Sequence, residues 1–237
     1  MFKRLASQVG AALLLFTVAV ASADSFAAEN SANRIPVKMV QNGALLNSME
    51  TRVPARRRLP HWAKVLRIMN TERKGFARCA SDNSKCDTPE RKEWSRMIAS
   101  ATSLENRDQL ETVNRFFNRY PYRRDPKTYG VPEYWASPDE FLKRSGDCED
   151  FAIVKFFALR QLGFSDNDLR IVVVYDWLRR IPHAVLAVHI DGDILILDNT
   201  RDYIVSHRQY RYYEPRLSMN ESGNWVHMKP RLRKSGT

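Results

Sequence analysis

The stretch GDCEDFAIVKFFALRQLG, residues 146–163, carries the strongest structural signal in the chain. Gly146 breaks the pattern before it, Gly163 closes it, and apolar side chains occupy every turn between them. This pattern predicts a helix over Cys148–Leu162 that is buried on nearly all sides. Such a helix belongs at the centre of a domain, so neighbouring elements should pack around it.

Helical signals precede this stretch and strand signals follow it. Apolar residues recur at helical spacing over 61–69 and 104–120, and helix starts lie at Thr88-Pro89 and Ser137-Pro138, with a loop-like segment over 122–138. Strands are predicted at Ile171–Val174, Ala184–Ile190 and Ile194–Leu197, and more weakly at Tyr210–Tyr213 and Trp225–Met228. The order predicts an α+β fold, with N-terminal helices and the buried helix packed on an antiparallel sheet.

The N-terminus has the parts of a secretion signal. Lys3 and Arg4 precede an apolar run over Val9–Ala21, and Ala21-Ser22-Ala23 offers a small-residue cleavage site. The run is shorter than the roughly 20 apolar residues of a membrane-spanning helix, although an uncleaved anchor is an alternative. We therefore expect an exported protein with no stable membrane insertion after signal cleavage.

The chain is expected to have four parts. Residues 1–23 form the signal peptide, 24–59 a flexible lead-in that contains Arg56-Arg57-Arg58, 60–230 one domain, and 231–237 a basic tail. The formal charge is 38 − 27 = +11, which favours acidic partners. No zinc-finger or RNA-binding signature accompanies it, so we expect a solvated basic surface and no nucleic-acid partner.

The chain contains three cysteines, and they differ in setting. Cys79 and Cys86 flank a short polar segment, where a disulfide would form in an oxidising compartment. A zinc site is the alternative, but partners at finger spacing are missing nearby. Cys148 is left over as a candidate reactive thiol at a helix start, where the helix dipole favours the thiolate. An inert buried cysteine is the alternative.

A predicted β-hairpin supplies an imidazole and a carboxylate. With Asp191-Gly192 as its two-residue turn, His183 and Asp198 become diagonal neighbours on one face, roughly 7–8 Å apart at the backbone. The Cys148 thiol, the His183 imidazole and the Asp198 carboxylate are together the three groups of an activated cysteine nucleophile. His189 is a rival base, and Asp198 is alternatively a turn residue.

The acidic residues beside the thiol require an explanation. Asp147, Glu149 and Asp150 should raise the pKa of Cys148, because their charges repel a thiolate. A hard cation bound by oxygen ligands would offset them, and calcium suits carboxylates in irregular geometry. The alternative is that they are solvated acids at a helix start.

Together these motifs resemble the bacterial transglutaminase-like cysteine proteinases, most closely their LapG-type periplasmic branch. The motifs are Gly146-Asp147-Cys148-Glu149-Asp150-Phe151-Ala152, Pro182-His183-Ala184-Val185-Leu186 and Leu197-Asp198-Asn199. The resemblance runs from about Trp62 to Trp225. It implies a papain-like or transglutaminase-like α+β core with a catalytic triad of Cys148, His183 and Asp198.

The resemblance also implies a cofactor, a substrate and a regulator. Calcium would be bound by Asp147, Glu149 and Asp150. The substrate would be a large surface adhesin, cut at a paired-alanine site near its N-terminus and released from the outer membrane, which promotes biofilm dispersal. An inner-membrane receptor for cyclic diguanylate would act as the inhibitor, and the protein would be periplasmic.

Two other functions are alternatives to the protease. A transglutaminase-type acyltransferase would employ the same three side chains, because both reactions pass through a thioester. A non-catalytic protein-binding module would not need them. Substitution of Cys148 separates the module from either enzyme.

Overall fold

The computed structural model describes residues 44–54 and 59–229. They fall within one of two units of the chain, which spans 36–237. The predicted signal peptide, the Arg56–Arg58 run and the basic tail lie outside the described residues. Among the helices formed by the described ranges, none combines the length and apolar character needed to cross a bilayer.

A seven-stranded sheet underlies the described part of the chain, with strand order β1-β7-β6-β2-β3-β4-β5. All paired strands are antiparallel, as predicted. The strands are β1 (Met49–Val53), β2 (Leu169–Asp176), β3 (Ile181–Ile190), β4 (Asp193–Leu197), β5 (Val205–Ser206), β6 (Tyr213–Met219) and β7 (Asn224–Met228). Four predicted strands therefore correspond to β2, β3, β4 and β7, the last of these predicted as Trp225–Met228.

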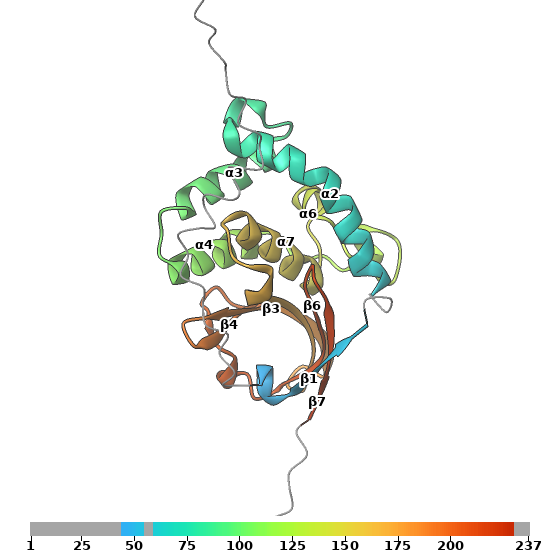
Figure 1. The fold of residues 1–237 in the computed structure, drawn as a ribbon. Coiled ribbons are helices and arrows are strands. Elements are labelled where there is room, and N and C mark those ends of the chain that lie inside the picture. Colours follow the sequence, from blue (N-terminus) through green and yellow to red (C-terminus); the bar gives the residue numbers. More distant parts are fainter. Residues whose placement is uncertain (1–43, 55–58, 230–237) are drawn as a thin grey trace, which may run out of the picture. The chain divides into compact units, whose positions relative to one another are not determined.

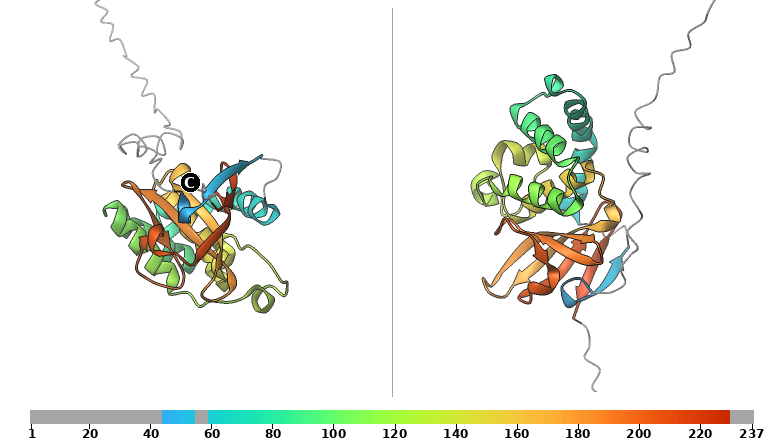
Figure 2. Two further views of the ribbon diagram at one scale, coloured as in Figure 1. Left: turned by 90° about the horizontal axis from the view of Figure 1, so that it is seen from below. Right: turned by 90° about the vertical axis from the view of Figure 1, so that its left-hand side faces the viewer.

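Helices cover one face of this sheet (Figures 1 and 2). They are α2 (Pro60–Ser81), α3 (Pro89–Ala101), α4 (Asn106–Asn118), α5 (Asp125–Thr128), α6 (Pro138–Arg144) and α7 (Cys148–Gln161). The described ranges also form the short 3-10 turns η1 (Leu45–Asn47), η3 (Asn83–Lys85), η4 (Asp166–Asp168) and η5 (His207–Gln209). Of these, η1 packs with Val185 on the other face of the sheet. α7 packs directly on β2 and β3 and also contacts α4 and α6. The α+β architecture predicted from the sequence is confirmed.

The buried helix is the centre of the helical layer. Every residue of α7 from Glu149 to Leu159 is buried, because α4 and α6 cover it on one side and the sheet covers it on the other. Its first residue is Cys148, as the sequence predicted. The packing fixes where that residue emerges from the protein interior.

The two faces of the sheet bury different residues. Along β3, Leu186 and Val188 pack into the core shared with the helices, whereas Val185 and Ala187 join a second cluster on the opposite face. This alternation follows from the two-residue period of a strand. His183 shares the face of Val185, so its ring lies on the side of the second cluster.

Two predictions about local structure were wrong. Residues 44–53 were assigned to the flexible lead-in, but they form η1 and β1, and β1 pairs with β7 at the edge of the sheet. The segment Tyr210–Tyr213 was predicted as a strand, but β6 begins only at Tyr213. Tyr210 and Tyr213 stack on each other in a turn. The prediction failed because aromatic residues are common in strands, whereas here they stabilise the turn that precedes β6.

The predicted disulfide is present. Cys79, in the last turn of α2, is bonded to Cys86, seven residues later. The bond fixes the polar connection between α2 and α3, a region far from α7 in the sequence. Cys148 is the free cysteine of the three.

Replacing both Cys79 and Cys86 with alanine should lower the free energy of unfolding by about 2–3 kcal/mol, since the cross-link restricts the unfolded chain. Urea unfolding of the oxidised wild type and the double variant measures the difference. Equal midpoints and slopes would show that the cross-link does not stabilise the fold.

Candidate active site

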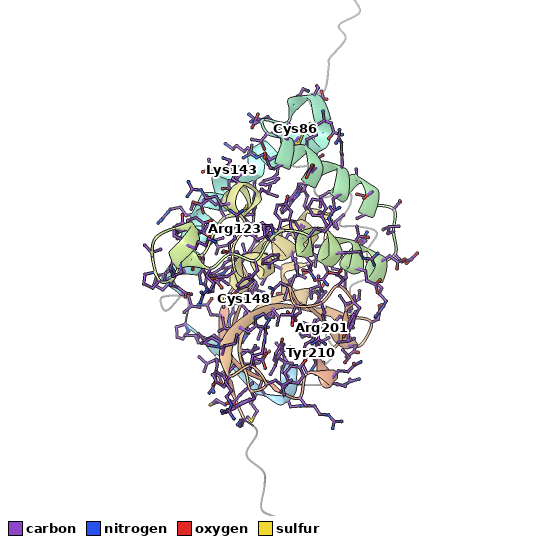
Figure 3. The ribbon with its side chains drawn as sticks, turned by 180° about the vertical axis from the view of Figure 1, so that it is seen from behind. Cys86, Arg123, Lys143, Cys148, Arg201 and Tyr210 are labelled. Atoms are coloured by element: carbon purple, nitrogen blue, oxygen red, sulfur yellow. A yellow bond between two sulfur atoms is a disulfide. The ribbon has the colours of Figure 1, made fainter. Side chains whose placement is uncertain are left out.

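Cys148 lies where the helical layer meets the sheet (Figure 3). It is only partly exposed, and the main chain of Ala184 on β3 makes a hydrogen bond to it. The thiol itself donates to Glu149 Oε2 across 3.4 Å. The nucleophile candidate is therefore held between the start of α7 and the residue that follows His183.

The β3–β4 hairpin brings His183 to Asp198. Ile190 pairs with Asp193, as the sequence predicted, and Asp191 and Gly192 form the turn with φ of 48° and 81°. His183 Nε2 lies 3.0 Å from Asp198 Oδ1, and both side chains are buried. The register inferred from the Asp-Gly turn is confirmed, and the second ring nitrogen of His183 is not used by this bond.

Asp198 accepts hydrogen bonds on both carboxylate oxygens. Oδ1 accepts from the Thr200 N–H at 2.9 Å as well as from His183, and Oδ2 accepts from the Tyr213 hydroxyl at 2.7 Å. Burial raises the pKa of Asp198, but the bond and charge of His183 and the two other donors outweigh it and hold the pKa well below its usual range. Asp198 is thus both a turn residue and the partner of the imidazole.

His189 is poorly suited to act as the base. It pairs with Ile194 on β4, which offers no carboxylate to orient its ring. Burial, with further contributions from Arg170 and His207, lowers its pKa to about 4. A general base works best when its pKa lies near the operating pH, which disfavours His189.

Five carboxylates converge at the start of α7. Three sets of possible metal ligands have donor atoms within 4.8 Å of one another: Asp147, Cys148 and Glu149; Asp125, Glu133 and Glu149; and Asp125, Asp147 and Asp150. The structure therefore adds Asp125 and Glu133 to the three acids predicted from the sequence. The cluster joins α5 and the following loop to α7.

The electrostatics of this cluster oppose its ionisation. Burial and the neighbouring carboxylates raise the pKa of Glu149 and of Asp150, and burial, with Asp147 and Glu133, raises that of Asp125 to about 6. Burial, Glu149 and Asp147 also raise the pKa of the Cys148 thiol, while the Ala184 hydrogen bond lowers it. So many acids beside one thiol indicate a site that needs positive charge.

Two oxygens in the cluster lack a hydrogen-bond donor. Oδ1 of Asp125 and Oδ1 of Asp147 are buried without a hydrogen-bond partner, an arrangement that costs free energy unless another group satisfies it. Asp150 is different, because its oxygens accept from the Ala136 N–H at 2.7 Å and the Asp147 N–H at 3.2 Å. Hard oxygen donors of this kind match the ligands that calcium prefers.

The aromatic residues of the loop between α5 and α6 pack against the core. Trp135 is buried in the core, and Tyr129 stacks on Tyr134 with ring centroids 4.0 Å apart. Asp125 Oδ2 accepts from the Tyr134 N–H at 2.6 Å. The loop therefore presents carboxylates to the start of α7 while its aromatics pack inward.

The sequence reasoning missed Asp125, Glu133 and Tyr213. Asp125 and Glu133 come from a loop-like segment without a periodic signal, Tyr213 closes a segment with only a weak strand signal, and all three reach the site only through tertiary packing. The one local hint was for Asp125, which follows Arg123-Arg124 and precedes a proline in an otherwise basic stretch.

Comparisons with known proteins show which family this chain is similar to. The profile of the bacterial transglutaminase-like cysteine proteinase family matches residues 71–232. Legionella pneumophila LapG is 32% identical, with a TM-score of 0.56 over 64% of this chain and 87% of that chain.

Two further structures of the same relative match. Calcium-bound Legionella pneumophila LapG is 35% identical, with a TM-score of 0.54 over 62% of this chain and 82% of that chain. The EGTA-treated form is 32% identical, with a TM-score of 0.56 over 64% and 84%. No curated protein matches the chain.

Replacing Tyr213 with phenylalanine should lower the free energy of unfolding at neutral pH by about 1–3 kcal/mol, because a buried carboxylate loses a donor. Tyr203, whose side chain is 62% exposed, provides the matched Tyr→Phe control and should change little. Urea unfolding of both variants measures the difference. Equal losses would mean that the hydroxyl of Tyr213 does not support Asp198.

Proposed function

The chain belongs to the bacterial transglutaminase-like cysteine proteinases, and we propose that it is a calcium-dependent cysteine endopeptidase with Cys148, His183 and Asp198 as its catalytic triad. The bond between His183 Nε2 and Asp198 Oδ1 carries this proposal. It leaves Nδ1 to act on the thiol. Cys148 supports the same assignment, because it is bound to the main chain of Ala184, the next residue after His183.

In the first half of the proposed reaction, His183 takes the thiol proton of Cys148. The sulfur attacks the scissile carbonyl carbon, and the carbonyl electron pair moves to oxygen, which the main-chain N–H at the start of α7 stabilises. The C–N bond then breaks, and the imidazolium gives its proton to the leaving amine. A thioester on Cys148 remains.

The second half restores the enzyme. A water molecule gives one proton to the neutral imidazole of His183 while its oxygen attacks the thioester. The C–S bond breaks with its electron pair going to the sulfur, the new acid is released, and the imidazolium returns its proton to the sulfur, which restores the thiol and the neutral imidazole. Asp198 keeps the ring orientation fixed throughout and stabilises the imidazolium that forms twice in each cycle.

The carboxylate cluster fits a calcium ion. Its proposed ligands are Asp147, Glu149 and Asp150, together with Asp125 and Glu133. The buried, unpaired oxygens of Asp125 and Asp147 support this choice, as does the calcium bound by the relative from Legionella pneumophila. When bound, the cation neutralises the acids beside Cys148 and so favours the thiolate.

The proposed substrate is a large surface adhesin, cut near its N-terminus at a paired-alanine site and released in biofilm dispersal. The proposed location is the periplasm, which agrees with the disulfide between Cys79 and Cys86. The proposed inhibitor is an inner-membrane receptor that responds to cyclic diguanylate. All three follow from the motifs at Cys148, His183 and Asp198 that resemble the LapG-type branch.

Replacing Cys148 or His183 with alanine should lower the cleavage rate by about 10⁴-fold, the order seen for catalytic nucleophiles and their bases. His189→Ala is the matched control on the same strand and should cleave normally. The measurement is the release of surface-protein fragments by the purified protein, with sequencing of the new ends. Cuts are expected between two alanines.

The same assay separates the competing functions. A labelled amine is included in the reaction, since an acyltransferase would join it to the substrate. Amine incorporation without chain cleavage would replace the protease by a transglutaminase. Wild-type activity of Cys148→Ala in cells would leave protein binding as the function.

Removal of calcium with a selective chelator should abolish cleavage, because uncompensated carboxylates raise the pKa of Cys148. Magnesium should restore it poorly, since it requires stricter octahedral geometry. Asp125→Asn should raise the calcium concentration needed for half activity by about 10-fold. Asp108→Asn, an exposed acid on α4, is the control. Full activity after exhaustive chelation, with wild-type rates for Glu149→Ala, would remove calcium from the proposal.

A further inference from the structure

A lysine is buried within the nucleophile helix. Lys155 has no solvent exposure, although it lies in the middle of α7 among apolar residues. Burial lowers its pKa to about 7, while the carboxylates of Asp198 and Asp202 raise it. An apolar residue would fill the same space at less cost, so the ammonium group needs a role that an apolar side chain does not supply.

The ammonium group binds the side chain of one asparagine. Lys155 Nζ donates to Asn118 Oδ1 at 2.7 Å, and Asn118 is the last residue of α4. A lysine can only donate hydrogen bonds. Its position therefore determines which end of the Asn118 amide is the oxygen and which is the nitrogen.

With its oxygen held by Lys155, the Asn118 amide directs its nitrogen at the turn that carries Asp198. Nδ2 donates to the main-chain oxygen of Asp198 at 3.0 Å, to that of Arg201 at 2.8 Å and to Asp202 Oδ1 at 3.1 Å. All three groups are acceptors. A reversed amide would place an oxygen against three oxygens and push the turn away.

Asn114, one helical turn before Asn118 on α4, binds the same segment after Asp198. Asn114 Nδ2 donates to the main-chain oxygens of Arg201 and Asp202, both at 2.9 Å. Asn118 reaches three residues closer to the site along the chain, because it also binds the main-chain oxygen of Asp198 itself. The carboxylate of Asp198 then extends from a main chain that is fixed on the helical side of the sheet.

We propose that Lys155 and Asn118 are positioning residues for the His183–Asp198 pair. Lys155 orients the Asn118 amide, and the amide holds the main chain of Asp198 at the distance from which its carboxylate meets His183. Cys148 and Lys155 lie seven residues, two helical turns, apart on α7. One helix therefore places the thiol and also fixes the partner of the imidazole.

This inference rests on the proposed function, so its assay must report on the thiol–imidazole pair without peptide cleavage. The rate at which iodoacetamide alkylates Cys148, followed by mass spectrometry in calcium-containing buffer, provides that readout, since the thiolate is the reactive form. The difference between wild type and His183→Ala defines the contribution of the imidazole.

Lys155→Met should keep the thermal midpoint of the wild type but slow alkylation by about 10-fold, the order of loss for a supporting hydrogen-bond partner. Asn118→Asp should slow it similarly, because Lys155 keeps a partner while the Nδ2 donors are lost. Ile153→Val, a buried apolar change in the same helix, is the control and should alkylate at the wild-type rate.

The outcomes separate the two proposals. If His183→Ala alkylates as fast as the wild type, the proposed catalytic pair fails. If His183→Ala is slow while Lys155→Met and Asn118→Asp match the wild type, only the positioning role is overturned.

An NMR spectrum of the wild type tests the positioning role of Asn118 even if a variant does not fold. The Asn118 side-chain amide protons should exchange slowly, and exchange at the rate of a free amide would overturn it.

Discussion

Repulsion among acids at the start of α7 is the constraint on which the rest of the site depends. Asp147, Glu149 and Asp150 surround a thiol, and the fold adds Asp125 and Glu133 from the loop beyond α4. Main-chain groups hold one of these acids in place, because the Asp150 carboxylate accepts hydrogen bonds from the N–H groups of Ala136 and Asp147. The protein therefore assembles negative charge where the proposed mechanism requires a thiolate, and the proposed calcium ion would offset that charge.

The second half of the site is built on the opposite principle, because every charge in it has a partner. Asp198 accepts from His183, Thr200 and Tyr213 through its carboxylate, and its main-chain oxygen accepts from Asn118. These donors come from β3, β6, α4 and the turn itself. The imidazole partner is thus fixed from both layers, whereas on the thiol side the proposed function assigns the compensating charge to a calcium ion.

Sequence patterns predicted the parts of the site that local rules control. The apolar run fixed α7 and placed Cys148 at its start, and the Asp-Gly turn gave the register that joins His183 to Asp198. The sequence did not predict the roles of Tyr213, Lys155 and Asp125, because tertiary packing alone brings these residues to the site. β1 escaped for a similar reason, since a short edge strand gains its partner from β7, which lies near the other end of the chain.

The central claim, that the acids at the start of α7 form a cation site, is tested most directly by calorimetric titration of the metal-free protein with calcium chloride. The account predicts one calcium ion bound per chain, and binding lost when Asp147 is replaced by asparagine. Absence of binding in the wild type, or equal binding by Asp147→Asn, would contradict it.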